Sequence, residues 1–248
     1  MKFILFFMLC AILGAEELLM HFDGQGSSFV DSSGRNHIIS VTGNVTQTTA
    51  TSVSGGKSAY FDGSSYLSIA TPNSFAFASG SDYTIDFWMK SSSNNRMHAL
   101  SFGIMGTDNI DFDFNDAGAL WLYHNSTGAN AIIPGSIGEY TNNQWHHVAA
   151  VRRNGTITAY IDGVSQGTLY MPAEMNGSST VYIGTCSYYS YGHNFNFTGY
   201  IDELRIVKGQ ALFTNNFDPT QNIPSSVPEP GSLILLLSGC LFLVYRKL

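Results

Sequence analysis

The chain has 248 residues, of which only 12% are charged, and its formal net charge at pH 7 is −7. This acidic balance argues against nucleic acid or an anionic lipid surface as a partner. Cys10 and Cys240 lie in apolar terminal segments, so the body of the chain keeps Cys186 alone and an intramolecular disulfide is excluded there.

The N-terminus has the three parts of a secretory signal peptide. Met1-Lys2 is basic, the stretch 3–13 is apolar, and Gly14-Ala15 offers small residues for cleavage. We therefore predict a signal peptide over 1–15, one domain over 16–222, and a linker with a separate tail over 223–248. A body of this length suits a single sandwich or barrel domain.

Between the two ends, short alternating runs separated by turn residues predict an all-β domain. The first strand is expected over 18–22. In the strand expected over 83–90, four apolar residues share one face and the other face carries Asp86, Trp88 and Lys90. In the run 110–114, the pattern predicts that Phe112 and Phe114 point inward and that Asp111 and Asp113 lie in water.

A hairpin is expected at Asn154-Gly155, because both residues tolerate positive φ. It joins the apolar-alternating runs 145–152 and 156–161. A two-residue and a three-residue loop both fit the sequence, and the two choices exchange which side chains pair across the hairpin. The sequence leaves that register open.

Four segments in order, 59–67, 83–90, 145–163 and 199–206, resemble the LamG-like branch of the concanavalin A-like jelly rolls. They include Tyr-Thr-Ile-Asp-Phe-Trp-Met-Lys, Trp-His-His-Val-Ala and Gly-Tyr-Ile-Asp-Glu-Leu-Arg-Ile. The resemblance implies an all-β jelly-roll sandwich of two antiparallel sheets. With the apolar ends, the expected fold adds a short hydrophobic helix at each terminus. The fold itself does not imply one activity.

Catalysis is not expected. Glycoside hydrolysis needs two carboxylates about 5 to 10 Å apart across the scissile bond. Laminarinase-type relatives carry them as Glu-x-Asp-x-Glu, and no glutamate in this chain has Asp at the second position after it.

Two apparent metal motifs fail on geometry. An EF-hand starting at Asp111 would need Gly at its sixth position and Glu at its twelfth, where the chain has Asp116 and Leu122. His146 and His147 are neighbours on a strand, so they point to opposite faces and are poorly placed to share one ion.

Calcium is suggested instead by the resemblance, since relatives of this fold often hold a structural Ca²⁺ between their first and last strands. On a regular strand, Asp202 shares its face with Leu204 and Ile206, and a buried carboxylate needs a partner. Asp23, at the end of the first predicted strand, is then a candidate ligand beside Asp202. The alternatives are that Asp202 accepts backbone N–H groups, pairs with an arginine, or is turned outward by a bulge.

Sugar binding is expected of exposed aromatic and polar clusters. Trp88 with Asp86 forms one candidate cluster, provided that their face lines the groove. The second candidate is the loop that contains Tyr188, Tyr189 and Tyr191. Both sets also fit ordinary packing, because jelly-roll loops pack their own tyrosines and Trp88 occupies a tryptophan position common to the family.

The C-terminus reads Val227-Pro228-Glu229-Pro230, an apolar run over 233–245, then Arg246-Lys247. As a helix that run is about 20 Å long, shorter than the ~30 Å hydrocarbon core of a bilayer. The order resembles the PEP-CTERM sorting signal. It implies a Gram-negative bacterium, a membrane sorting protease of the exosortase type, an inner-membrane-tethered intermediate, and delivery to the cell surface or extracellular matrix. The alternative is a tail anchor that stays uncut.

Together these observations predict an exported, non-catalytic, lectin-like protein that binds an extracellular polysaccharide. The alternative is a structural or adhesion protein that binds proteins. A glycosidase with an unfamiliar site is a third, weaker reading.

Overall fold

The computed structural model describes residues 16–70, 74–102, 110–114, 120–124, 129–133, 138–171, 180–186 and 195–224. For 120–124 and 129–133 the description covers the backbone pairing. The predicted signal peptide, the loop with Tyr188, Tyr189 and Tyr191, and the C-terminal tail lie outside these residues. None of the described helical segments has the length and apolarity of a membrane span.

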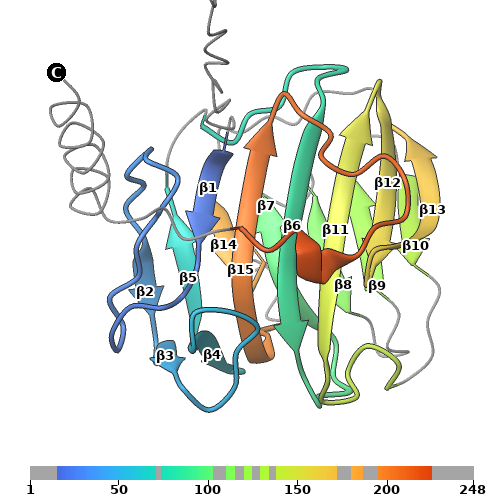
Figure 1. Ribbon diagram of the computed structural model, residues 1–248. Coiled ribbons are helices and arrows are strands. Elements are labelled where there is room, and N and C mark those ends of the chain that lie inside the picture. Colours follow the sequence, from blue (N-terminus) through green and yellow to red (C-terminus); the bar gives the residue numbers. More distant parts are fainter. Residues whose placement is uncertain are drawn as a thin grey trace, which may run out of the picture.

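Two antiparallel sheets pack face to face (Figure 1). The front sheet has the order β13-β12-β11-β6-β15-β4-β3, with β1 paired to β15. Its strands are β1 Glu16–Met20, β3 Thr46–Thr48, β4 Ser58–Asp62, β6 Tyr83–Lys90, β11 Trp145–Arg153, β12 Thr156–Ile161, β13 Val164–Tyr170 and β15 Thr198–Lys208. The back sheet, in the order β10-β9-β8-β7-β14-β5-β2, contains β2 Ser40–Thr42, β5 Tyr66–Ile69, β7 Met97–Phe102, β8 Asp111–Phe114, β9 Leu120–His124, β10 Ala129–Ile133 and β14 Val181–Ile183.

One hydrophobic core fills the space between the sheets. From β6, Ile85, Phe87 and Met89 enter it, and from β8 Phe112 enters it, with the Phe87 and Phe112 rings 5.2 Å apart at 77°. The predicted alternation of β6 is thus confirmed, and with it the all-β sandwich of two antiparallel sheets.

The hairpin between β11 and β12 has a two-residue loop, because Arg153 pairs with Thr156. Asn154 and Gly155 both have positive φ, 50° and 77°, as the primed turns of tight hairpins require. Asp162-Gly163 repeats the arrangement between β12 and β13, with φ of 49° and 76°. The structure therefore resolves the register that the sequence left open.

The first strand begins and ends two residues earlier than predicted, at Glu16 and Met20. It pairs with the second half of β15, from Leu204 to Val207, while β4 pairs with the first half, from Thr198 to Ile201. Between the halves a bulge at Asp202 and Glu203 changes the register.

Candidate functional site

Part of the outer face of the front sheet is covered by residues 209–222, which we call the C-terminal strap (Figure 1). It crosses in front of β6, β11 and β12 (Figure 1, orange to red). Phe213 forms a cluster with Ala149, Val151 and Tyr160 beneath it, and its ring stacks on Phe217 at 3.8 Å and 10°.

Trp88 and Asp86 lie on the outer face as predicted, beside His147, whose ring contacts Phe213 of the strap. Trp88 is 8% exposed and its ring meets His147 edge-on at 5.2 Å. Asp86 is 2% exposed and accepts two hydrogen bonds from Arg205, 3.0 Å from Nε and 2.7 Å from Nη2. His147 Nε2 lies 3.2 Å from the same carboxylate.

Arg205 and His147 compensate the buried negative charge of Asp86. Burial raises the pKa of the Asp86 carboxyl, but Arg205 and His147 outweigh that effect and hold the pKa below its usual range. The interpretation of Trp88 and Asp86 as a sugar platform depended on an open face. Both side chains are buried in this structure, so that condition is not met at Trp88 and Asp86.

The outer face of the back sheet offers a different arrangement. Each strand of this sheet contributes one residue to a single row, because these residues are paired from one strand to the next. The row crosses β2, β5, β14, β7, β8, β9 and β10 in that order. The row consists of Ser40, Ser68, Tyr182, Ser101, Asp111, Tyr123 and Asn130. We call it the cross-sheet row; every member can make hydrogen bonds.

The neighbours of the row point into the core, which fixes its face. Val181 and Ile183 flank Tyr182, and Ile110 and Phe112 flank Asp111; all four are core residues. Six interstrand steps of about 4.8 Å make the row ~29 Å long. Its accessible polar groups lie at one end, where Ser40 is exposed and Ser68 and Tyr182 are half-buried.

Aromatic rings accompany the row at its better-exposed end. Tyr66 and Tyr182 are half-buried, and their rings meet at 6.0 Å and 63°. Toward the other end, Ser101 donates a short hydrogen bond to Asp111, and both residues are buried. Beyond Asp111, the backbone register places Tyr123 in the row and Trp121 opposite Asp113.

The burial of the two aspartates of β8 contradicts one prediction. Phe112 and Phe114 do point inward, but Asp111 and Asp113 are 1% and 5% exposed rather than in water. Asp113 is held by Arg96, whose Nη2 donates at 2.6 Å, and His98 Nε2 lies 3.8 Å away. Desolvation lowers the pKa of His98 to about 4, so that imidazole stays neutral.

Asp23 and Asp202 approach the same loop, residues 51–57. Asp202 accepts the N–H groups of Val53 and Ser54 at 2.7 and 3.4 Å, and Asp23 accepts that of Lys57 at 3.2 Å. The bulge turns Asp202 to the outer face, away from Leu204 and Ile206, so the regular-strand prediction is corrected and the backbone N–H alternative is confirmed.

The two carboxylates differ from a typical calcium site, which needs six to eight oxygen ligands. Burial raises the pKa of Asp202 to about 7, against the opposing hydrogen bonds from Val53 and Ser54. Within the described residues no three His, Cys, Asp or Glu side chains are grouped to hold a metal ion. The calcium site stays a prediction without support from this geometry.

The neighbouring histidines behave as expected of a strand. His146 Nδ1 contacts Asp162 at 2.8 Å, whereas His147 contacts Asp86. They serve two different carboxylates.

Residues 61–212 match the Laminin_G_3 family, described as the concanavalin A-like lectin/glucanases superfamily. The chain belongs to this family. A comparison with curated proteins gives no match.

Solved structures of the same fold include three informative neighbours. The binding domain of Paraclostridial Mosquitocidal Protein 1 is 16% identical with a TM-score of 0.63, over 80% of this chain and 49% of that one. Domain 4 of AbnA, a GH43 extracellular arabinanase from Geobacillus stearothermophilus solved with arabinotriose, is 21% identical with a TM-score of 0.61, over 80% and 94%. The botulinum neurotoxin serotype D binding domain is 17% identical with a TM-score of 0.60, over 84% and 50%.

This lectin/glucanase domain spans about half the length of the two toxin binding domains. At these identities the likeness establishes the shared fold. The cross-sheet row was not anticipated from the sequence, because its members come from strands that are distant in the chain and only the pairing register aligns them.

Proposed function

We propose that this protein is a non-catalytic carbohydrate-binding protein and that its glycan lies on the exposed end of the cross-sheet row, over Ser40, Ser68 and Tyr182. The observation that carries the proposal is the row itself, with the half-buried Tyr66–Tyr182 pair at its better-exposed end. Sugar rings present C–H faces that pack on aromatic side chains, and hydroxyl groups that exchange hydrogen bonds with serine and tyrosine hydroxyls. The row combines both kinds of group.

The family adds support, since it unites lectins with glucanases. Among structures with this fold, the arabinanase domain was solved with arabinotriose and a botulinum neurotoxin binding domain in complex with SialylT. Those ligands belong to those proteins. For this chain they motivate a panel of neutral and acidic glycans rather than one sugar.

The non-catalytic part of the proposal rests on the state of the acids. A glycosidase needs one carboxyl group as acid and a second as base or nucleophile, both facing the substrate bond. Asp113 is held by Arg96, and Asp111 is buried against Ser101. Incubation with β-glucan, galactan and arabinan is therefore expected to release no reducing ends; sustained release would overturn this part.

Binding is tested with the full chain in a sugar-free detergent, by affinity electrophoresis against a panel of polysaccharides that includes those of the host. Tyr182→Ala removes one ring from the row and should weaken binding about tenfold, which corresponds to ~1.4 kcal/mol. The matched control is Tyr200→Ala. Tyr200 is also half-buried and pairs with Tyr60 at 5.1 Å, but on the front sheet.

Three outcomes decide whether the glycan binds at the row. Loss in Tyr182→Ala with retention in Tyr200→Ala supports the row. Equal loss in both variants would place binding elsewhere or indicate a general effect on folding. No binding to any polysaccharide would favour the alternative, a structural or adhesion protein of the extracellular matrix that binds proteins.

We also propose that the chain is exported by its signal peptide and sorted through Val227-Pro228-Glu229-Pro230, the apolar run and Arg246-Lys247. An exosortase-type protease would act on a membrane-tethered intermediate before delivery to the surface or matrix. Replacing Pro228, Glu229 and Pro230 by alanine in the host should leave the protein in the membrane fraction. Unchanged release would contradict this route.

A further inference from the structure

A second row of side chains crosses the outer face of the front sheet. The pairing register aligns one residue from each of β3, β4, β15, β6 and β11. We call it the aromatic–lysine row, and its members are Thr46, Tyr60, Tyr200, Lys90 and Trp145. All five are half-buried, and their chain neighbours Phe61, Met89 and Ile201 belong to the core. The row therefore faces outward and is accessible to a ligand.

The C-terminal strap packs on a different part of this face. Along β11 it contacts Val151, Ala149 and His147. Trp145 begins β11 and Lys90 ends β6, so both lie beyond these contacts. The row is thus set apart from the buried positions of Trp88 and Asp86.

The aromatic rings of the row lie on both sides of its lysine. Tyr200 and Trp145 are the two cross-strand partners of Lys90, and their rings are 6.4 Å apart at 56°. The ring of Tyr60 continues the surface on the far side of Tyr200, at 5.1 Å and 46°. Such rings offer apolar faces to the C–H groups of a sugar, and the tyrosines add hydroxyl groups.

Lys90 supplies a cation that has no acidic partner. Its Nζ lies 3.4 Å from Thr51 Oγ1, which also accepts a hydrogen bond from Trp145 Nε1 at 3.0 Å. Among the described residues, Lys90 takes part in none of the ion pairs. An ammonium group has three N–H donors, so donors remain for a ligand. In a chain with a formal net charge of −7, this is a point where an anion can be recognised.

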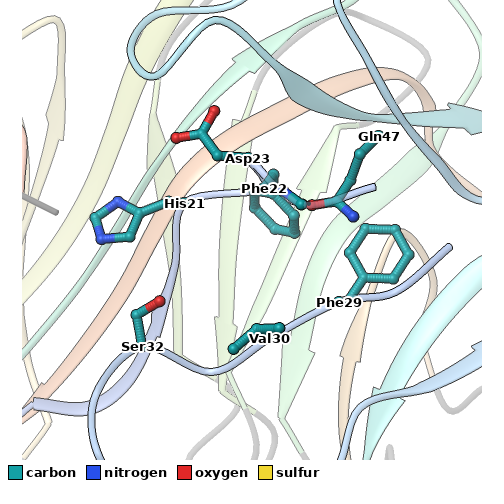
Figure 2. Close-up of a pocket in the computed structure, with 8 residues that line it drawn as sticks. His21, Phe22, Asp23, Phe29, Val30, Ser32 and Gln47 are labelled. Carbon is teal, nitrogen blue, oxygen red and sulfur yellow. Dashed lines mark hydrogen bonds between the residues drawn. The ribbon is translucent and has the colours of Figure 1, made fainter. Parts of the chain in front are cut away.

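The loop 51–57 that carries Thr51 is fixed by acids of the front sheet. Asp202 accepts the N–H groups of Val53 and Ser54, and Asp23 accepts that of Lys57. Figure 2 shows the Asp23 carboxylate turned away from Phe29 and Val30. These hydrogen bonds position Thr51 without a ligand, and preorganisation of this kind lowers the cost of binding.

We propose that the aromatic–lysine row binds a sugar ring that carries a carboxylate, as in the uronic acid residues of acidic polysaccharides. The carboxylate pairs with the Lys90 ammonium, and the C–H face of the ring packs on Tyr200 and Trp145. This site lies on the opposite sheet from the cross-sheet row and has its own class of ligand. The proposal therefore goes beyond the proposed function and does not depend on it.

The test is isothermal calorimetry on the full chain in an uncharged, sugar-free detergent. The probes are trimers of galacturonic acid and of glucuronic acid, each beside its neutral methyl ester. At least one acid trimer should bind more tightly than its ester, and its binding should weaken as salt is added. Lys90→Met keeps the apolar stem but removes the charge, so it should weaken binding of the acid about tenfold, whereas Lys90→Arg should retain it.

The matched control is Lys57→Met. Lys57 is also half-buried and lies at the end of the loop 51–57, but its Nζ donates to Gly24 O and it is not part of the row. The proposal stands if Lys90→Met loses the acid trimer while Lys57→Met and Lys90→Arg keep it, with all three variants melting as the parent does. It falls if no acid trimer binds, if acid and ester bind equally, or if Lys90→Met binds as the parent does. Equal loss in the two methionine variants also overturns it.

The two sites are distinguished by their own variants. Tyr182→Ala should leave binding of the acid trimer unchanged; a loss there would place the acid on the cross-sheet row and overturn the proposal. The Tyr200→Ala control for the cross-sheet row applies to neutral polysaccharides, which carry no carboxylate for Lys90. Binding of a neutral polysaccharide that depends on Tyr182 would survive failure of the lysine site.

Discussion

At the scale of single residues, the front sheet is organised around Asp86. Its carboxylate is buried and accepts a bidentate pair of hydrogen bonds from Arg205, and His147 is its second partner. A buried ion pair of this kind contributes little relative to an apolar replacement of both partners, but removing one partner leaves an uncompensated charge.

Arg205→Met should therefore lower the free energy of unfolding by roughly 3–5 kcal/mol, measured by urea denaturation. Arg35→Met is the matched control, since the Arg35 side chain is 53% exposed and lies 3.8 Å from Glu17. It should cost about 0–1 kcal/mol. Equal effects of the two substitutions would contradict the role assigned to Asp86.

Asp202 makes the stability depend on pH. Its folded-state pKa of about 7 exceeds the ordinary value of 3.8. Between about pH 4 and 7 the folded protein keeps a proton that the unfolded chain releases, so this group's contribution to stability falls as pH rises through that window. Above about pH 7 both states have released the proton and the contribution is flat.

Asp202→Asn removes this dependence while keeping an oxygen that can accept from Val53 and Ser54. From pH 5 to pH 8, the free energy of unfolding of the variant should therefore increase relative to that of the parent, meaning that the variant becomes relatively more stable, as followed by thermal and urea melts at each pH. Parallel profiles for the two proteins would show that Asp202 does not titrate with a raised pKa.

At the scale of elements, the C-terminal strap packs on the outer face of the front sheet (Figure 1). Its Phe213 is 6% exposed and packs on Ala149, Val151 and Tyr160. Thr84 Oγ1 also accepts the N–H of Leu212 at 2.9 Å and lies 3.0 Å from Gln210 O, which ties the strap to β6.

Phe213→Ala should lower the free energy of unfolding by about 3 kcal/mol, as expected for a buried aromatic ring. It should also increase quenching of tryptophan fluorescence by acrylamide, because Phe213 packs on His147 and the His147 ring contacts Trp88. Thr214→Ala, at the exposed neighbouring position, should stay within about 0.5 kcal/mol of the parent. Unchanged quenching in Phe213→Ala would mean that the strap does not protect this face.

The elements also show how far sequence patterns reach. The alternation of 83–90 predicted both the strand and its two faces, and Asn154-Gly155 predicted the hairpin, because these are local features. The bulge at Asp202–Glu203 breaks the alternation without any glycine to announce it. Asp113 pairs with Arg96, 17 positions away, and Asp86 pairs with Arg205, 119 positions away. The burial of the two aspartates could therefore not be deduced from their own strands.

At the scale of the whole molecule, the two outer faces differ in where side chains remain accessible. On the front face, the residues first expected to bind sugar, Trp88 and Asp86, are buried. On the back face, the row is buried at Ser101 and Asp111 but accessible at Ser40, Ser68 and Tyr182, beside Tyr66. That row requires the register of six strand pairs, which no local pattern contains.

The most direct test of the central claim is amide hydrogen exchange of the full chain with and without a polysaccharide that it binds. Our account predicts that protection increases in the back sheet, in β2, β5 and β14 around Ser40, Ser68 and Tyr182. Protection confined to β6, β11, β15 or the C-terminal strap would instead place the glycan on the front face and contradict the account.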